Sequence, residues 1–239
     1  GVVYVTTLSG TIQAYRADAG QPVQLWETTD AEFSGFNGGC TVTRDGYLYA
    51  ADYNFYGGQD NSILCKIDCD DGSVVWKTPT ERTNFVPLVV GEMIYISGGI
   101  DGYASKVKVT AYRDLGDRAE KLWQTDPNLR VGGWTHQPAF ADGKLYAGGS
   151  SSGEQLFAAY DRLYILDANL TPKDANFVID DYSGCGSTAA IGHDHIYSVG
   201  PAGLYKFQQP ALFADISDDG QVDTRDLAEL GGCWLDMPA

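Results

Sequence analysis

The sequence predicts an all-β protein built from five repeats of a four-stranded antiparallel unit. One tyrosine recurs in five glycine-led segments, at Tyr4, Tyr49, Tyr95, Tyr146 and Tyr197, with spacings of 45, 46, 51 and 51 residues. No window before residue 220 shows sustained helical periodicity, and 29 of the 239 residues are glycine, which excludes a helical solenoid. A period of roughly 40 to 50 residues with four strands each is typical of a β-propeller.

The strands follow the same order in each unit. A first strand precedes the tyrosine strand across a tight turn in the last four units, at residues 40–46, 85–92, 137–143 and 187–194. The tyrosine strands themselves begin at residues 1, 46, 91, 143 and 192. Third strands are expected at 11–17, 62–68, 106–112, 162–168 and 203–207, and fourth strands at 23–27, 74–78, 121–125 and, more weakly, 176–180. Asp-Gly pairs before two of the tyrosine strands, at Gly46 and Gly143, are strong hairpin signals.

The strand count falls short of five complete blades. The first unit lacks its innermost strand and the last lacks its outermost one, so residues 1–209 do not predict a closed ring. Two explanations remain open: a longer parent chain that carries further blades, or completion of the open blades by a neighbouring subunit through strand addition. A β-sandwich or jelly roll is the alternative fold, but it would not repeat a glycine-led tyrosine strand five times.

The turns between third and fourth strands share a motif. Residues 14–26, 66–76 and 111–123 read AYRADAGQPVQLW, KIDCDDGSVVW and AYRDLGDRAEKLW. They resemble the A-x-D-x-x-T-G-x-x-x-W motif of pyrroloquinoline-quinone-like propeller repeats, and the resemblance covers most of residues 1–209. Trp26, Trp76 and Trp123 are then expected to lie flat against neighbouring blades. Because the fourth repeat, residues 167–177, has no tryptophan, less regular packing is expected there.

Composition and charge narrow the function. A net charge of −16 repels phosphate backbones and anionic membrane surfaces, so nucleic acid is excluded as a partner. The longest apolar runs, such as residues 86–90, are far too short for a membrane span. The five cysteines cannot all pair within one chain, and we expect small buried side chains in a β core rather than a zinc or redox site.

The C-terminal segment, residues 210–239, predicts a calcium loop followed by a short helix. Its loop pattern matches D-x-[DN]-x-[DN]-G with oxygen ligands at Asp215, Ser217, Asp219, Gln221, Asp223 and Asp226. The segment resembles one half of a type I dockerin, in which the twelfth ligand is Asp, as Asp226 is here. The resemblance implies calcium as the cofactor and an extracellular or cell-surface location.

Candidate binding residues lie in the glycine-rich connections of the propeller. Asn84, Trp134 and His136 are predicted near the mouth of the channel, and His136 in particular begins an inner strand. Tyr53, Tyr56 and Tyr103 occupy other loops, where aromatic faces can stack on sugar rings. Packing of these side chains on the blade edges is the alternative interpretation.

These observations favour a secreted, non-catalytic propeller that binds or scaffolds a protein or glycan partner, with the dockerin-like tail for attachment or stabilisation. Self-association through the open blade edges is a further expectation. An extracellular polysaccharide-acting enzyme is one alternative. The other is a quinoprotein dehydrogenase, which the resemblance of the repeats suggests. Such enzymes typically have an adjacent Cys-Cys pair and several cationic side chains around the cofactor, whereas here no two cysteines are adjacent and cationic side chains are scarce.

Overall fold

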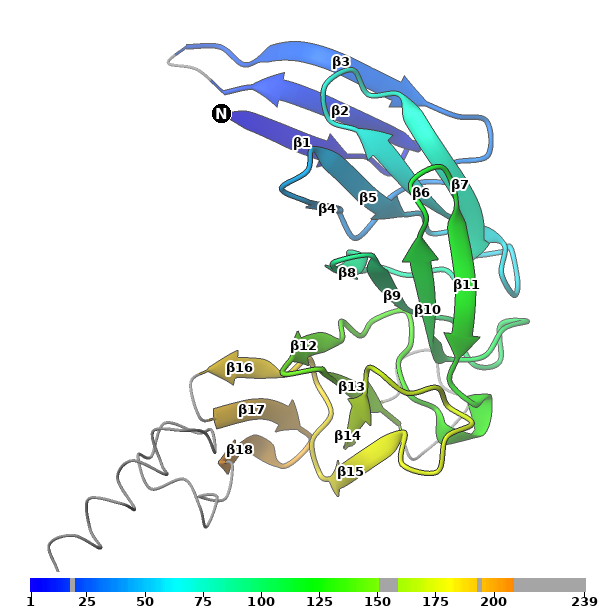
Figure 1. The fold of residues 1–239 in the computed structure, drawn as a ribbon, viewed down its shortest axis with the longest axis vertical. Helices are drawn as coiled ribbons and strands as arrows, with labels where there is room; N and C mark the ends of the chain where they lie inside the picture. Colours follow the sequence, from blue (N-terminus) through cyan, green and yellow to red (C-terminus); the bar gives the residue numbers. More distant parts are fainter. Residues whose placement is uncertain (18–19, 151–158, 193–194, 209–239) are drawn as a thin grey trace, which may run out of the picture.

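The computed structural model describes residues 1–17, 20–150, 159–192 and 195–208, and it has the predicted all-β propeller architecture (Figure 1). The first sheet contains β1 (Val2–Thr6), β2 (Thr11–Arg16) and β3 (Val23–Thr29). The second contains β4 (Cys40–Val42), β5 (Tyr47–Ala51), β6 (Ser62–Asp68) and β7 (Val74–Thr80). The third contains β8 (Leu88–Val90), β9 (Met93–Gly98), β10 (Lys108–Asp114) and β11 (Ala119–Gln124).

The last two sheets continue the repeat. The fourth sheet contains β12 (Ala139–Ala141), β13 (Lys144–Gly149), β14 (Arg162–Asp167) and β15 (Val178–Ser183). The fifth contains β16 (Ala190–Gly192), β17 (His195–Gly200) and β18 (Gly203–Gln208). Every sheet is an antiparallel meander in chain order, and a 3-10 turn at Pro127–Leu129 (η1) is the helical element of the described ranges. No helix in these ranges is long and apolar enough to cross a membrane.

A register shift recurs at the same place in the first four sheets. The third and fourth strands of each unit slip by one residue, next to Tyr15, Ile67, Tyr112 and Leu166. Such a bulge increases the local right-handed twist. Its recurrence shows that the units are structural repeats as well as sequence repeats.

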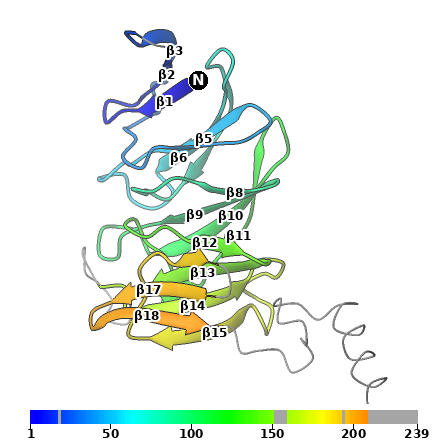
Figure 2. The ribbon, with the colours of Figure 1, turned by 90° about the vertical axis from the view of Figure 1, so that its left-hand side faces the viewer.

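The five sheets follow one another along an open arc (Figure 1). Both views place β1–β3 at one end of the arc and β16–β18 at the other (Figure 2). The described residues therefore do not close into a ring, as the strand count predicts. Within them β1 pairs on one side with β2 only, and its Val2 and Val3 side chains are exposed.

Each junction between neighbouring sheets has its own apolar core, and the repeated Tyr–Trp pair contributes to the first three. Trp26 and Trp76 are buried, and each donates its indole N–H to the next sheet: Trp26 Nε1 to the Cys69 carbonyl at 3.0 Å, and Trp76 Nε1 to Asp114 Oδ1 at 3.0 Å. The predicted packing of these tryptophans against neighbouring blades is confirmed.

Asp114 is the polar centre of the junction between the second and third sheets. Its carboxylate accepts hydrogen bonds from the Tyr49 hydroxyl at 2.6 Å and from Lys66 Nζ at 2.7 Å, in addition to the Trp76 indole. Burial raises the pKa of Asp114, but the bonds from Lys66, Tyr49 and Trp76 outweigh it and hold the pKa below its usual value. The same contact, together with burial, raises the pKa of Tyr49. The junction is therefore held by one ionised, multiply hydrogen-bonded carboxylate.

Cys40, Cys65, Cys69 and Cys185 are free thiols, and Cys65 and Cys185 are buried. Burial is the first cause of a raised pKa at each of the four. The expectation of buried core cysteines therefore applies to these two. The predicted tail, residues 210–239, lies outside the described residues. Its six calcium ligands, Asp215, Ser217, Asp219, Gln221, Asp223 and Asp226, and the domain boundary at residue 209 stay predictions.

Candidate functional site

The connections between consecutive units, and those between the second and third strands of a unit, lie on one face of the arc, called here the loop face. Because the strands alternate in direction, the segments 30–39, 52–61, 81–87, 99–107 and 125–138 all leave the sheets on the same side. Backbone hydrogen bonds tie them together. The Tyr53 N–H donates to the Gly35 carbonyl at 2.7 Å, the Asn84 N–H donates to Trp134 at 2.8 Å, and the Trp134 N–H donates to Gly99 at 3.0 Å.

An aromatic surface, defined by Tyr53, Phe55, Tyr56, Tyr103 and Trp134, lies on the loop face. Tyr53 and Trp134 are stacked, with ring centroids 5.5 Å apart and an interplanar angle of 23°. Phe55 lies 5.0 Å from Tyr56 and 5.4 Å from Tyr103. Tyr56 is 94% exposed and Tyr103 is also exposed. Residues from three separate connections thus form one continuous group of rings, of which Tyr56 and Tyr103 are exposed and the other three are half-buried.

The buried Arg82 side chain stabilises this surface through hydrogen bonds to two of its loops. It is 0% exposed, and its guanidinium donates from Nη1 to the Phe55 carbonyl and from Nη2 to the Tyr103 carbonyl. Its own carbonyl accepts from the Gly99 N–H at 3.0 Å. A planar guanidinium presents several donors in a fixed geometry, so one side chain can link two loops at a set distance. Burial lowers the pKa of Arg82, but the arginine pKa is so high that the side chain stays charged.

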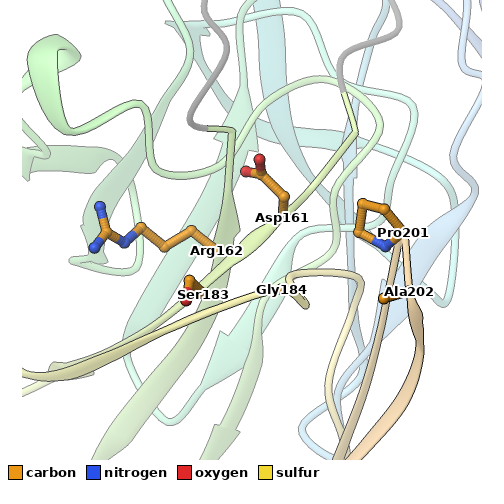
Figure 3. A pocket seen from close by; sticks show the side chains of 6 residues that line it. All are labelled: Asp161, Arg162, Ser183, Gly184, Pro201 and Ala202. Atoms are coloured by element: carbon orange, nitrogen blue, oxygen red, sulfur yellow. The ribbon is translucent and has the colours of Figure 1, made fainter.

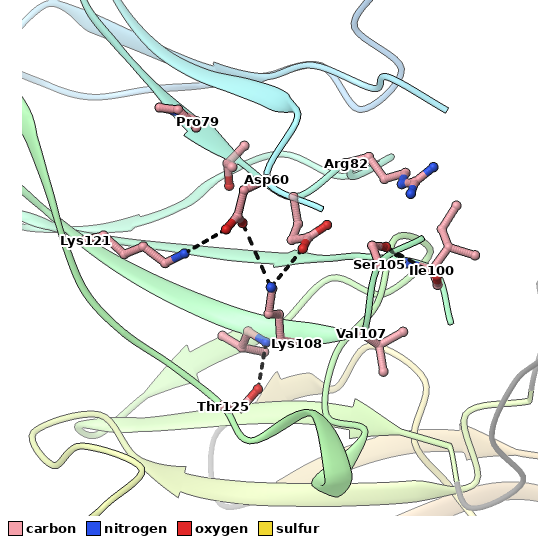
Figure 4. Close-up of polar contacts among 12 residues, drawn as sticks. Asp60, Pro79, Arg82, Ile100, Ser105, Val107, Lys108, Lys121 and Thr125 are labelled. Carbon is pink, nitrogen blue, oxygen red and sulfur yellow. Dashed lines mark hydrogen bonds and ion pairs between the residues drawn. The ribbon is translucent and has the colours of Figure 1, made fainter. Parts of the chain in front are cut away.

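A buried ion pair lies beside Arg82 and supports the same loops (Figure 4). Lys108 Nζ lies 2.8 Å from Glu81 Oε1, and both side chains are 1% exposed. Asp60 extends the network to the surface, with its carboxylate 3.9 Å from Lys108 and 3.3 Å from Lys121. Burial raises the pKa of Glu81, while Lys108 opposes the shift. The network connects the 52–61 loop with β10 and β11, so it limits movement of the loop that carries three of the aromatic rings.

The structure brings together two of the three residues predicted as ligand contacts. Asn84 and Trp134 are joined through their backbones, and Asn84 Oδ1 accepts from Asn37 Nδ2 at 2.9 Å. His136 differs, because its side chain is 1% exposed and its Nε2 accepts from the Gly148 N–H at 2.7 Å. Burial lowers the pKa of His136 to about 3, so the ring is neutral near pH 7. In this arrangement His136 is a packing residue.

A hollow opens on the loop face between the fourth and fifth sheets (Figure 3). Its volume is about 380 Å³, and its lining residues are Asp161, Arg162, Ser183, Gly184, Pro201 and Ala202. The Arg162 side chain is directed away from Pro201 and Ala202, and its Nε lies 2.8 Å from Asp181 Oδ2. The one cationic side chain in the described lining of this hollow is therefore already paired.

The aromatic surface offers ring faces and amide groups, which suit binding by stacking and hydrogen bonding. Within the described ranges, no group of three or more His, Cys, Asp or Glu side chains is placed to hold a metal ion. Phe55 and Arg82 were not expected from the sequence. Phe55 had a usable signal, because it lies between two loop tyrosines, whereas nothing local marks Arg82 as buried.

Comparison with known proteins places this geometry in a family context. A family model described as "Outer membrane protein assembly factor BamB" matches residues 8–168. No curated protein matches the chain in sequence. Among solved structures, BamB from Moraxella catarrhalis is similar at 13% identity and a TM-score of 0.58, covering 86% of this chain and 54% of its own.

Redox enzymes share the same fold. The quinohemoprotein alcohol dehydrogenase ADHIIG from Pseudomonas putida HK5 is similar at 16% identity and a TM-score of 0.58, covering 87% of this chain and 39% of its own. A europium-containing methanol dehydrogenase is similar at 13% identity and a TM-score of 0.55, covering 91% and 52%. The chain thus spans about half or less of the length of these proteins. At such identities the likeness shows the fold alone.

Proposed function

The chain belongs to the family described as outer membrane protein assembly factor BamB, and from this premise we propose that it is a secreted, non-catalytic propeller that binds or scaffolds a partner through the aromatic surface. One observation carries the proposal. The five rings of that surface come from three connections, and the buried Arg82 fixes two of those connections to each other. A preorganised group of rings, two of them exposed, loses little conformational freedom on binding, which favours affinity.

The chemistry of the surface favours a polysaccharide as the partner. Aromatic faces pack against the apolar sides of sugar rings, and the side-chain amides of Asn37 and Asn84 supply donors and acceptors for hydroxyl groups beside them. A net charge of −16 argues against an acidic polymer and for a neutral one. A protein partner, as the description of BamB as an outer membrane protein assembly factor suggests for that protein, is the other outcome that the experiment distinguishes.

We further propose that the tail, residues 210–239, binds calcium and attaches or stabilises the propeller outside the cell. The support is the spacing of six oxygen ligands in the sequence. Five carboxylates within this loop repel one another when the metal is absent, so calcium acts as a folding ligand for the segment.

The test is a glycan array followed by calorimetric titration with the oligosaccharide that binds. Tyr56→Ala is expected to weaken binding by roughly tenfold or more, because one stacked ring contributes of the order of 1 to 3 kcal/mol in comparable stacking interactions. Tyr15→Ala, which removes a tyrosine from β2 outside the aromatic surface, serves as the matched control and is expected to bind normally.

Two outcomes would overturn the polysaccharide assignment. Absence of any bound glycan, together with a protein partner whose capture from the native source depends on Tyr56, would assign the surface to protein docking. Equal affinity of wild type and Tyr56→Ala would remove the aromatic surface from the binding site altogether.

A further inference from the structure

A second candidate site lies where the repeated hydrogen bond of the tryptophan indole is missing. In the first three sheets the repeated tyrosine and tryptophan rings form the same pair, with centroid distances of 5.8 Å for Tyr4–Trp26, 6.1 Å for Tyr49–Trp76 and 6.0 Å for Tyr95–Trp123. Trp26 and Trp76 donate their indole N–H groups to the residue that ends or follows the third strand of the next sheet.

Trp123 has no such partner. The strand register places Ala168 of the fourth sheet at the position that Cys69 and Asp114 occupy in the second and third. Ala168 has no side-chain acceptor like that of Asp114. The Trp123 indole N–H bonds neither to the Ala168 carbonyl, as Trp26 does to the Cys69 carbonyl, nor to any other residue in the described part of the chain. Trp123 is half-buried and meets Phe177 of the fourth sheet edge-on at 5.4 Å. The junction between the third and fourth sheets is therefore packed differently from the two before it.

A pocket of about 580 Å³ lies at this junction, on the face opposite to the loop face. Its apolar lining includes Met93, Tyr95, Trp123, Phe140 and Leu170. The connection between β14 and β15, residues 168–177, is longer than the matching turns at 69–73 and 115–118, and its first residues form one wall. The volume is within the range of small-molecule sites, which are mostly apolar with a few polar groups.

Two hydrogen-bond donors at this pocket have no acceptor among the residues that the structure describes. One is the Trp123 indole N–H. The other is the guanidinium of Arg113, which lines the pocket, is exposed, and has no carboxylate within ion-pair distance among the described residues. An arginine without a partner is notable in a chain whose net charge is −16. A carboxylate is the natural complement of a guanidinium, because it accepts two parallel hydrogen bonds.

We propose that this pocket binds a small aromatic carboxylic acid. The aromatic ring lies against Tyr95, Trp123 and Phe140, and the carboxylate accepts hydrogen bonds from Arg113 and from the Trp123 indole. The site is independent of the proposed partner-binding surface, because it lies on the opposite face of the arc and shares no residue with it.

The probe is N-acetylphenylalanine, titrated into the full chain by calorimetry, with its C-terminal amide as the uncharged counterpart. The binding free energy per atom that is typical for ligands of this size predicts a Kd of roughly 1 mM or tighter. The amide is expected to bind roughly tenfold more weakly, because the charge-assisted hydrogen bonds are lost. Equal affinity of acid and amide would overturn the proposal, as would absence of binding by the acid.

Matched variants locate the site. Arg113→Gln is expected to weaken binding of the acid roughly tenfold, whereas Arg118→Gln, a change of the same type in the exposed turn after β10, leaves it unchanged. Trp123→Phe keeps a ring and removes the indole N–H, and is expected to weaken binding roughly threefold to tenfold. Trp76→Phe removes an indole N–H that donates to Asp114 instead, so it lowers stability without affecting affinity. Equal effects of the two tryptophan changes on affinity would contradict the assignment.

A peptide probe distinguishes a pocket for small acids from a pocket for the C-terminus of a polypeptide. If acetyl-Ala-Ala-Phe binds about as tightly as N-acetylphenylalanine, the pocket recognises the terminal aromatic acid alone and the proposal stands. If the peptide binds more than roughly tenfold tighter, contacts beyond the acid dominate and the small-acid assignment is wrong.

Discussion

Replacement of Asp114 by asparagine should weaken the junction between the second and third sheets. The Asp114 carboxylate lies 2.7 Å from Lys66 Nζ, and the side chains are 10% and 5% exposed. It also accepts from the Tyr49 hydroxyl and the Trp76 indole. Asp114→Asn leaves one acceptor oxygen for these bonds but removes the charge opposite Lys66.

The size of the stability loss follows from leaving Lys66 without its carboxylate partner. Removing one partner of a buried ion pair costs about 3 to 5 kcal/mol, because the remaining charge stays in a poorly solvated position. The lower end of this range applies here, since the asparagine oxygen still accepts one hydrogen bond and Lys66 keeps its contact with the Tyr47 ring at 3.9 Å. We therefore expect a loss of about 3 kcal/mol in the free energy of unfolding.

Urea denaturation followed by tryptophan fluorescence measures this loss. Asp114→Asn combined with Lys66→Met removes both charges, so it should be more stable than Asp114→Asn alone. Asp30→Asn, at an exposed pair with Lys77 that also has Glu32 as a partner, is the control and should show no measurable change.

The reasoning also predicts a pH dependence. Because the folded-state pKa of Asp114 is lowered, its contribution is complete above the ordinary pKa of aspartate and is lost as the pH falls through the folded-state pKa. The difference between wild type and Asp114→Asn should shrink over the same interval. A variant within about 1 kcal/mol of wild type at pH 7 would refute the account of this junction.

Three further predictions concern the core, the buried histidine and the tail. Trp76→Ala should cost roughly 3 to 5 kcal/mol, the range for removing a buried large aromatic, and an unchanged urea midpoint would show that Trp76 does not hold the junction. Because burial lowers the pKa of His136 to about 3, only the unfolded chain gains its proton below pH 6.5. The free energy of unfolding should therefore fall by up to about 1.4 kcal/mol per pH unit as the pH is lowered from 6.5 to about 3. His136→Gln should remove this pH dependence from the urea midpoints. Asp219→Ala should abolish calcium binding in calorimetry of the full chain without changing the unfolding of the blades. If calcium, like magnesium, produces no heat of binding with the wild-type chain, the loop is an acidic turn and not a calcium site.

Much of the fold was predictable because it depends on local periodicity. The tyrosine strands, the Asp-Gly turns and the aromatic fourth strands repeat within the sequence. Among the residues that the structure describes, the first and last sheets have three strands and each of the others has four. Less regular packing of the fourth repeat followed from the missing tryptophan in residues 167–177. In the structure the long connection of this repeat, residues 168–177, forms one wall of the pocket beside Trp123.

The candidate sites were less predictable, because they depend on contacts between distant segments. His136 looks like an accessible ligand group in the sequence, but the fourth sheet covers it and Gly148 occupies its Nε2. Arg82 looks like a surface cation, yet it is enclosed by loops that begin more than one strand away. Asp114 resembles a turn residue, and only the packing of two sheets makes it the acceptor for three side chains. No local pattern encodes these approaches.

The central claim is that the aromatic surface of the loop face contacts the partner. The indole N–H signals of the five tryptophans, assigned with single Trp→Phe variants, report directly on this claim in a nitrogen–proton NMR titration with the oligosaccharide selected on the array. The account predicts that the Trp134 signal shifts in proportion to binding while the signals of the buried Trp26 and Trp76 stay in place. A titration in which binding is measurable but Trp134 does not move, or in which Trp26 or Trp76 moves instead, would contradict it.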